Sequence, residues 1–341
     1  METLRLNGFT PDDDGVKTAA RILREGGIVA IPTETVYGLA ANAYDADAIV
    51  KVFEAKGRPQ DNPLIVHISE FDQLYPLVTE VPETAKKLAE AFWPGPLTMV
   101  LPKSDLLPDC VSAGLETVAI RMPSDQVARA VIDESGCPLA APSANLSGRP
   151  SPTTAAHVVN DLDGRVDGIL MSGDCEVGVE STVILLANGK RRLLRPGGVT
   201  LEMLEAVIGP VELDRAVLSE EITENVSSPG MKYKHYSPDA KITLVKGDYN
   251  SFCEYVNSEA TDGVYAMIFN DDDAVKLRVP YITYGSEDYK MLSHALFDSL
   301  RILDKKGAKQ CFVRYPDDEN DDNLAVLNRL LRAAGFNVVS V

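Results

Sequence analysis

The sequence has 341 residues, about twice the length of an ordinary domain, so we expect two domains, each with a core of its own. Hydrophobic residues make up 45% and charged residues 25% of the chain, which is typical of folded globular proteins and excludes collagen-like and globally disordered classes. The formal net charge of −18 opposes general binding of nucleic acid or nucleotides, so a polyanionic ligand must meet a local basic cavity.

Residues 15–209 alternate short apolar runs with amphipathic stretches, the pattern of a mixed α/β domain. The predicted strands are Ile28–Ile31, Pro63–Ile68, Leu97–Leu101, Val118–Arg121, Leu139–Ala141, Gly168–Met171, Ser181–Leu186 and Arg191–Arg195. The predicted helices are Ala46–Glu54, Pro82–Phe92, Ser124–Glu134 and Thr153–Asp161. Because strands outnumber helices, an open, twisted, mixed sheet is favoured over strict βαβ alternation.

Residues 210–240 are predicted to be a linker, because an acidic stretch gives way there to Ser-Ser-Pro-Gly and then to Met231–Pro238. A simple tether has no need for two tyrosines, two lysines and a histidine within Lys232–Tyr236. Composition alone therefore leaves tethering and binding equally open for its second half.

A smaller Rossmann-like α/β domain is predicted from Lys241 onward. Its predicted strands are Ile242–Val245, Val264–Phe269, Arg278–Tyr284, Gln310–Tyr315 and Asn337–Val341. Its predicted helices are Tyr249–Asn257, Glu287–Asp304 with Ser286 as N-cap, and Asn323–Ala334 ended by Gly335. The first strand is not followed by G-x-G-x-x-G, so dinucleotide binding has no support in the sequence.

The five cysteines are dispersed, with no C-x-x-C pair, which indicates neither a zinc site nor a disulfide framework and favours a cytoplasmic protein with reduced thiols. The start of the chain lacks the features of a signal peptide, and no stretch approaches ~18 uncharged apolar residues, so we expect no membrane association. The acidic runs are interpreted as solvated loops rather than metal sites; they are Asp12–Asp14, Asp271–Asp273 and Asp317–Asp322.

Four regions place polar or cationic side chains at predicted strand ends, where α/β proteins hold ligands. They are Pro32–Leu39, Lys56–Pro59 with Asn62–His67, Pro142–Pro152, and Gly178–Val183 with Leu194–Gly197. Each has a structural alternative, such as a capped turn, a cationic helix end or an ordinary loop. Taken together, they predict one concave surface whose positive charge comes from Lys56, Arg58, Arg121 and Arg195.

Six segments carry a family resemblance, in this order: Pro32–Gly38, Lys56–Pro59 with Asn62–Leu64, Trp93–Thr98, Thr117–Arg121, Ala141–Asn145 and Glu180–Val183. They closely resemble the YrdC/Sua5 family of threonylcarbamoyl-AMP synthases, and Ser228–Pro238 before a small α/β domain resembles the longer Sua5 form. The resemblance implies a YrdC-like catalytic domain over residues 1–209, a linker over 210–240 that closes over the active site, and a Sua5-type C-terminal domain over 241–341.

The resemblance further implies condensation of L-threonine, bicarbonate and ATP to threonylcarbamoyl-AMP with release of pyrophosphate. This product serves the N6-threonylcarbamoyl modification of adenosine 37 in tRNA, through threonylcarbamoyl transferase machinery. ATP is then a substrate that we expect to arrive with Mg²⁺. The alternative from another class is a non-enzymatic protein that binds double-stranded RNA; the net charge argues against strong RNA affinity and leaves weak contact with tRNA as an expectation.

By motif position, the resemblance implies threonine contacts from Thr33, Thr35, His67, Arg121, Ala141 and Ser181. It implies ATP contacts from Lys56, Arg58, Asn62, Thr117, Ser143, Asn145, Ser151 and Arg195, and from the linker residues Lys232, Tyr233 and Tyr236. N-carboxythreonine brings its own oxygen nucleophile to the α-phosphate, so no nucleophilic side chain is required and Lys56, Arg58 and Arg121 are expected to catalyse by positioning and neutralising charge.

Two segments depart from the family pattern. Many relatives carry a histidine where this chain has Ser124-Asp125-Gln126, and a D-G-G triplet where it has Met171-Ser172-Gly173. Neither departure falls on a residue assigned to a ligand.

Overall fold

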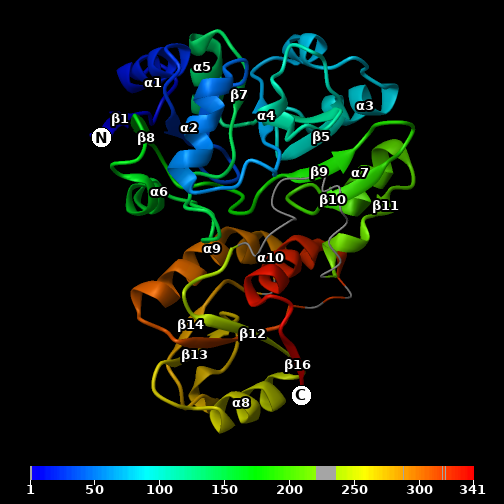
Figure 1. The fold of residues 1–341 in the computed structure, drawn as a ribbon. Coiled ribbons are helices and arrows are strands. Elements are labelled where there is room, and N and C mark those ends of the chain that lie inside the picture. Colours follow the sequence, from blue (N-terminus) through cyan, green and yellow to red (C-terminus); the bar gives the residue numbers. More distant parts are fainter. Residues whose placement is uncertain (1, 220–235, 287, 317, 319) are drawn as a thin grey trace. The chain divides into compact units, whose positions relative to one another are not determined.

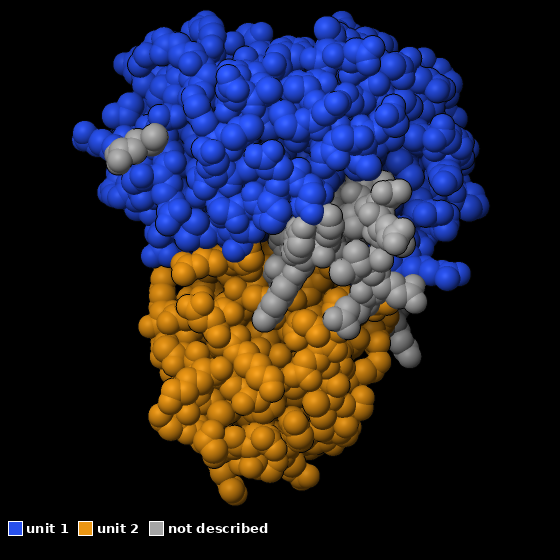
Figure 2. All heavy atoms as spheres, in the orientation of Figure 1, with its two compact units in different colours: residues 1–147, 151–217, 221–232 blue, residues 148–150, 218–220, 233–341 orange. Residues whose placement is uncertain are grey.

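The structure, a computed structural model, describes residues 2–219, 236–286, 288–316, 318 and 320–341 (Figure 1). The described residues divide into two compact units (Figure 2). Unit 1 comprises 2–147 and 151–217, and unit 2 comprises 148–150, 218–219 and 236 to the end of the chain. None of the helices in these described residues has the length and apolar character that a bilayer crossing needs.

Unit 1 is built on an 11-stranded sheet with the order β1-β8-β2-β3-β7-β4-β6-β5-β9-β10-β11. The strands are β1 (Leu4–Asn7), β2 (Val29–Ile31), β3 (Gly38–Asn42), β4 (Ile65–His67), β5 (Leu97–Pro102), β6 (Thr117–Arg121), β7 (Leu139–Ala140), β8 (Gly168–Met171), β9 (Thr182–Leu185), β10 (Arg192–Arg195) and β11 (Glu212–Leu213). Neighbours such as β4 and β6 run parallel, whereas β5 and β6 run antiparallel. The expected mixed sheet is confirmed.

Helices cover this sheet and build its core. They are α1 (Asp14–Arg24), α2 (Ala46–Lys56), α3 (Glu83–Phe92), α4 (Asp109–Ser112), α5 (Gln126–Ser135), α6 (Ala155–Leu162) and α7 (Leu201–Ile208), with 3₁₀ turns η1 (Phe71–Leu77) and η2 (Arg215–Val217). In α1, the buried residues Val16, Ala19, Ala20 and Leu23 follow the helical spacing of one apolar face. That face packs with α5 against β2, β3, β7 and β8, and the two helices lie side by side in Figure 1.

Unit 2 contains a 5-stranded sheet of order β14-β13-β15-β12-β16, and every neighbouring pair is parallel. Its elements are β12 (Lys241–Lys246), α8 (Tyr249–Ser258), β13 (Val264–Ile268), η3 (Ala274–Lys276), β14 (Tyr281–Thr283), α9 (Tyr289–Lys305), β15 (Gln310–Arg314), η4 (Asp321–Asn323), α10 (Leu324–Ala334) and β16 (Val338–Ser340). A parallel sheet joined through helices confirms the expected α/β class. Gly335 ends α10 in the left-handed conformation, as predicted.

One predicted cap in unit 2 is wrong. Ser286 was expected to cap the long helix, but α9 begins at Tyr289 and its N-cap is Asp288. The Asp288 carboxylate accepts hydrogen bonds from the main-chain N–H groups of Lys290 and Met291. A carboxylate is favoured at this position because it also meets the positive end of the helix dipole.

Arg314 holds together the carboxyl edge of the unit 2 sheet. Its guanidinium lies 5.3 Å from the ring centres of both Tyr249 and Phe269. Nη1 donates to the Gly247 carbonyl at 3.0 Å, and Nε lies 3.3 Å from an oxygen of Asp272. This edge is where Rossmann-like domains bind ligands, and here an arginine of the chain joins the ends of β12, β13 and β15.

The cap of α2 gives a stability prediction. Asp45 Oδ1 accepts hydrogen bonds from the N–H groups of Asp47 and Ala48, at 3.0 and 3.1 Å. Asp45→Ala is expected to lower the free energy of unfolding of unit 1 by about 1 kcal/mol, whereas Asp45→Asn keeps an acceptor and costs only a few tenths. Urea unfolding followed by fluorescence measures this directly, because the single tryptophan, Trp93, belongs to unit 1. Equal losses in the two variants would contradict the capping role.

Candidate active site

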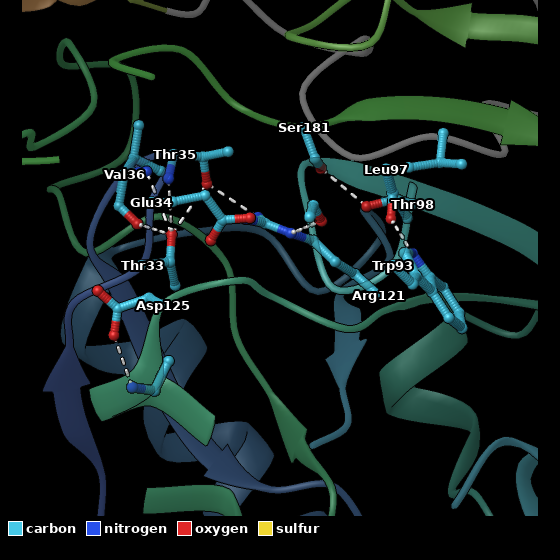
Figure 3. A network of polar contacts seen from close by, with 12 residues as sticks. Thr33, Glu34, Thr35, Val36, Trp93, Leu97, Thr98, Arg121, Asp125 and Ser181 are labelled. Carbon is cyan, nitrogen blue, oxygen red and sulfur yellow. Dashed lines mark hydrogen bonds and ion pairs between the residues drawn. The ribbon is translucent and has the colours of Figure 1, made fainter. Parts of the chain in front are cut away.

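Arg121, the last residue of β6, is the centre of a buried polar network (Figure 3). Its side chain is only 4% exposed. Nη1 donates to Thr35 Oγ1 at 2.8 Å, Nε donates to the Gly95 carbonyl at 3.3 Å, and Nη2 lies 2.7 Å from Glu34 Oε1. Groups from the turn between β2 and β3 and from the loop before β5 therefore fix the guanidinium.

The two threonines of the β2–β3 turn form a hydrogen-bonded chain of fixed direction. The Thr35 hydroxyl accepts from Arg121, and because the Thr33 proton goes to the Val36 carbonyl, the Thr35 proton is the one between the two hydroxyls, which lie 2.9 Å apart. Thr33 Oγ1 in turn donates to the Val36 carbonyl at 2.6 Å and accepts from the main-chain N–H of Thr35. The Val36 carbonyl thus sets the direction of both hydroxyl protons, and Arg121 supplies the donor at the other end of the chain.

Two carboxyl groups near Arg121 have pKa values shifted in opposite directions. Burial by itself would raise the pKa of Glu34, but the charge and hydrogen bonding of Arg121, with help from nearby main-chain N–H groups, hold that pKa below its ordinary value. Burial raises the pKa of Asp125, and the negative charge of Glu34 adds to the rise. Asp125 Oδ1 accepts a 2.7 Å hydrogen bond from Ala128 N, which explains its place as the cap of α5.

His67 lies beside Arg121, because β4 and β6 pair these two residues in register. Burial, and next the positive charge of Arg121, lower the pKa of His67 to about 3. The imidazole is therefore neutral, and its Nδ1 lies 3.1 Å from the Ile65 carbonyl, which fits donation from Nδ1–H. A neutral ring leaves Nε2 as an acceptor.

Ser181 is the centre of a second buried network, just before β9. Its hydroxyl lies 2.7 Å from Thr98 Oγ1 on β5, and Arg195 Nη2 donates to Ser181 Oγ at 3.1 Å. Arg195 Nε also donates to the Ser181 carbonyl at 3.0 Å. Since β5 pairs Thr98 with Arg121 on one side and Val183 on the other, this strand connects the two networks.

Lys56, in the last turn of α2, holds the loop after β7. Its ammonium donates to the carbonyl oxygens of Ser143 at 2.5 Å and Asn145 at 2.6 Å. The Ser143 hydroxyl donates to Asn145 Oδ1 at 2.5 Å. Burial, and next the charge of Arg58, lower the pKa of Lys56 well below its ordinary value. Lys56, Ser143 and Asn145, which were expected to contact phosphate, are thus hydrogen-bonded to one another.

Three further residues from the predicted ATP set lie in structured surroundings. Arg58 Nη2 donates to the carbonyl oxygens of Asn62 and Pro63, each at 3.2 Å. The Asn62 side-chain oxygen is buried and has no hydrogen-bond partner within the described residues. The Ser151 hydroxyl donates to the Glu180 carboxylate, and both side chains are buried.

The remaining predicted residues do not all join these networks. Thr117 begins β6, so four residues at about 3.3 Å each place it about 13 Å along the strand from Arg121. Ala141 extends β7 and donates its N–H to the Ile65 carbonyl. Tyr236 is buried in unit 2, with its ring 5.2 Å from that of Phe297. Lys232 and Tyr233 lie outside the described residues.

Sequence reasoning gave no role to two residues that the networks depend on. Glu34 and Thr98 both lie in recognised motifs, but the motifs do not show which residues they contact. The structure pairs Glu34 with Arg121 and Thr98 with Ser181. Thr98 is 0% exposed, although it is a polar residue in an otherwise apolar strand. No group of three metal-ligating side chains occurs among the residues that the structure describes.

The environment of His67 predicts its titration. The unfolded chain takes up a proton near pH 6.5, whereas the folded protein resists it down to about pH 3, so His67 lowers stability progressively as the pH falls through this window. NMR of the imidazole, assigned with His67→Gln, is expected to show a neutral ring from pH 8 to about pH 5. A titration midpoint near the ordinary value would contradict the buried, Arg121-facing position.

Gly197 gives a second stability prediction, because a Cβ there would lie 2.6 Å from the Glu180 carbonyl oxygen and collide with Thr182 N. These are main-chain atoms on both sides of Ser181, so Gly197→Ala is expected to cost about 1–3 kcal/mol of unit 1 stability. Gly173→Ala is the matched control, since a Cβ at Gly173 meets nothing within 4 Å. Urea unfolding followed by Trp93 fluorescence measures both variants, and equal stabilities would refute the close approach.

Family models match nearly the whole chain. The Sua5/YciO/YrdC model, described as "Telomere recombination", matches residues 21–197, and the model described as "Threonylcarbamoyl-AMP synthase, C-terminal domain" matches residues 199–335. A relative from Pyrococcus abyssi named threonylcarbamoyl-AMP synthase is 43% identical over 334 residues, which cover 96% of each chain. One from Bacillus subtilis with the same name is 45% identical over 336 residues, covering 97% of this chain and 96% of the relative.

A solved structure has the same fold throughout. The crystal structure of P. abyssi Sua5 complexed with L-threonine superposes with a TM-score of 0.92 at 41% sequence identity, covering 99% of this chain and 100% of that one. The expected fold class, with its YrdC-like first sheet and smaller second domain, is thereby confirmed. This chain belongs to the Sua5/YciO/YrdC family, in the two-domain form that carries the threonylcarbamoyl-AMP synthase C-terminal domain.

Proposed function

We propose that this enzyme condenses L-threonine, bicarbonate and ATP to threonylcarbamoyl-AMP and pyrophosphate in unit 1. The observation that carries the proposal is the buried guanidinium of Arg121, held among Thr35, Glu34 and Gly95 beside a neutral His67. A buried, oriented arginine is suited to a carboxylate, and the relatives that match nearly the full chain are named for this reaction. P. abyssi Sua5 has been solved with L-threonine bound.

This reaction requires the protein to position its substrates and to neutralise the charge of the phosphates. A carbamate oxygen of N-carboxythreonine forms a bond to the α-phosphorus while the bond from that phosphorus to the pyrophosphate oxygen breaks, so the electron pair leaves with pyrophosphate. No side-chain nucleophile takes part. Thr33, Thr35, His67, Arg121, Ala141 and Ser181 are the proposed threonine contacts, with Arg121 facing the carboxylate and the hydroxyls of Thr35 and Ser181 facing polar groups of the substrate.

Negative charge builds on the triphosphate and the leaving pyrophosphate. Lys56, Arg58 and Arg195 are the proposed counter-charges. Asn62, Thr117, Ser143, Asn145 and Ser151, with the linker residues Lys232, Tyr233 and Tyr236, complete the proposed ATP set. Mg²⁺ would enter as part of the ATP substrate, with the phosphates as its main ligands. The linker over 210–240 is proposed to close during turnover, and residues 241–341 to form the C-terminal domain.

The product carries an activated threonylcarbamoyl group, whose consumer must be a transferase that acts on an amine. We assign that role to the tRNA-modifying threonylcarbamoyl transferase machinery and place the reaction in the cytoplasm. The alternative of a non-enzymatic protein that binds double-stranded RNA is not favoured, because the relatives are named as enzymes and the net charge is −18.

Pyrophosphate release tests the proposal. Wild-type protein with ATP is expected to release pyrophosphate only when bicarbonate and L-threonine are both present. Arg121→Lys keeps the charge but loses the planar fork, so kcat/KM for threonine is expected to fall at least about tenfold. Arg129→Lys is the control, because Arg129 pairs with the exposed Glu70 outside the two networks. If folded protein binds RNA and its pyrophosphate release does not depend on threonine, the proposed reaction is wrong and the RNA-binding alternative is supported.

A further inference from the structure

Glu34 carries a buried charge whose oxygens are not fully used by the protein. The residue is only 6% exposed, and the contacts that Arg121 and nearby main-chain N–H groups make with its carboxylate lack ideal hydrogen-bond geometry within the described residues. The same holds for Nη2 of Arg121, although it lies 2.7 Å from Glu34 Oε1 (Figure 3). A buried ion pair is costly unless its remaining donors and acceptors are satisfied. Arg121 Nη2 and the Glu34 oxygens therefore keep hydrogen-bonding capacity beyond their mutual ion pair.

We infer that Glu34 and Arg121 together recognise the two polar ends of an α-amino acid, with Arg121 facing the carboxylate and Glu34 accepting an N–H from the amino nitrogen. The inference rests on the proposed function and deepens it, because it gives the threonine site a residue that the motif comparison did not assign. Glu34 becomes a determinant of specificity for amino acids over hydroxy acids.

The spacing of the pair fits such a ligand. In an α-amino acid the nitrogen and the nearer carboxylate oxygen are separated by the Cα and carboxyl carbons, so they lie about 3 Å apart. Arg121 Nη2 and Glu34 Oε1 are 2.7 Å apart. An amino acid can thus lie alongside the protein's ion pair with each of its groups facing a group of opposite polarity. Glu34 also comes from the same turn as Thr33 and Thr35, and the Thr35 hydroxyl accepts a hydrogen bond from Arg121.

The contact survives the carboxylation of threonine. N-carboxythreonine retains one N–H, which a carboxylate can still accept. Because Arg121 holds the pKa of Glu34 below its ordinary value, Glu34 is a weak base. It therefore orients the nitrogen and is not assigned the removal of its proton.

A competing explanation is that Glu34 serves only as the counter-ion of Arg121. In that case its loss would disturb the carboxylate site alone and would weaken every carboxylate ligand by the same factor. A ligand that keeps the carboxylate and the hydroxyl but lacks the amino group separates the two explanations. (R)-3-hydroxybutyrate is that analogue of L-threonine.

Calorimetric titration of the full chain with each ligand tests the inference. Wild-type protein is expected to prefer L-threonine over (R)-3-hydroxybutyrate by about tenfold or more, the worth of one charge-assisted hydrogen bond. Glu34→Gln is expected to reduce that preference to about threefold or less. Glu70→Gln, which removes an exposed carboxylate paired with Arg129, is the matched control and is expected to leave the preference unchanged.

Three results would overturn the inference: a wild-type protein that binds both ligands equally, a preference unchanged in Glu34→Gln, or equal weakening of both ligands in that variant. Should Glu34→Gln fail to fold, Glu34→Asp keeps the charge but shortens its reach, and the preference is then expected to fall. The proposed function is tested separately: pyrophosphate release by wild-type protein that does not depend on threonine would contradict it.

Discussion

Placing a guanidinium in the interior of a sheet costs several kcal/mol unless charge and hydrogen-bond partners are brought to it, and Arg121 is the group for which unit 1 must supply them. The partners come from separate parts of the chain: a carboxylate and a hydroxyl from the β2–β3 turn, and a carbonyl from the loop before β5. Their convergence depends on the strand order, which sets β6 between β4 and β5. Burial lowers the pKa of His67, and the Arg121 charge that strand register places beside its ring lowers it further.

The position of the cations also resolves the conflict between the net charge and a polyanionic ligand. Lys56, Arg121 and Arg195 are all no more than 4% exposed, and each donates to main-chain carbonyls inside unit 1. Their charge is thus concentrated in the interior instead of being spread over the surface. Such an arrangement suits a small anion that can enter and be desolvated, and it offers little to the long phosphate backbone of a nucleic acid.

Much of the fold was predictable because strong local signals agreed with the tertiary structure. The helix at α2 has a capping aspartate, an apolar face and a final glycine in the left-handed conformation. By contrast, no strand was predicted at β3 (Gly38–Asn42), because glycine and alanine have low strand propensity and its pairing with β2 and β7 makes it a strand. The apolar face of α1 was present in the sequence but is built partly from alanine, which weakens the signal.

In the site, motif resemblance pointed to Arg121 and Ser181, whereas their partners Glu34 and Thr98 emerge only from strand register and the path of the turn.

The hydrogen bonds of Lys56 set a limit on the nucleotide contact proposed for it. A lysine has three N–H donors, and two of them are committed to the carbonyls of Ser143 and Asn145. The third is directed at Asn145 Oδ1, 3.4 Å away, and a hydrogen bond of this length is weak. If Lys56 contacts ATP as proposed, one phosphate oxygen can replace the Asn145 amide oxygen while the loop stays in place, and a second can bind only by displacing a loop carbonyl. On the proposed ATP contact, nucleotide affinity and the order of this loop would be coupled through the three hydrogen-bond donors of one nitrogen.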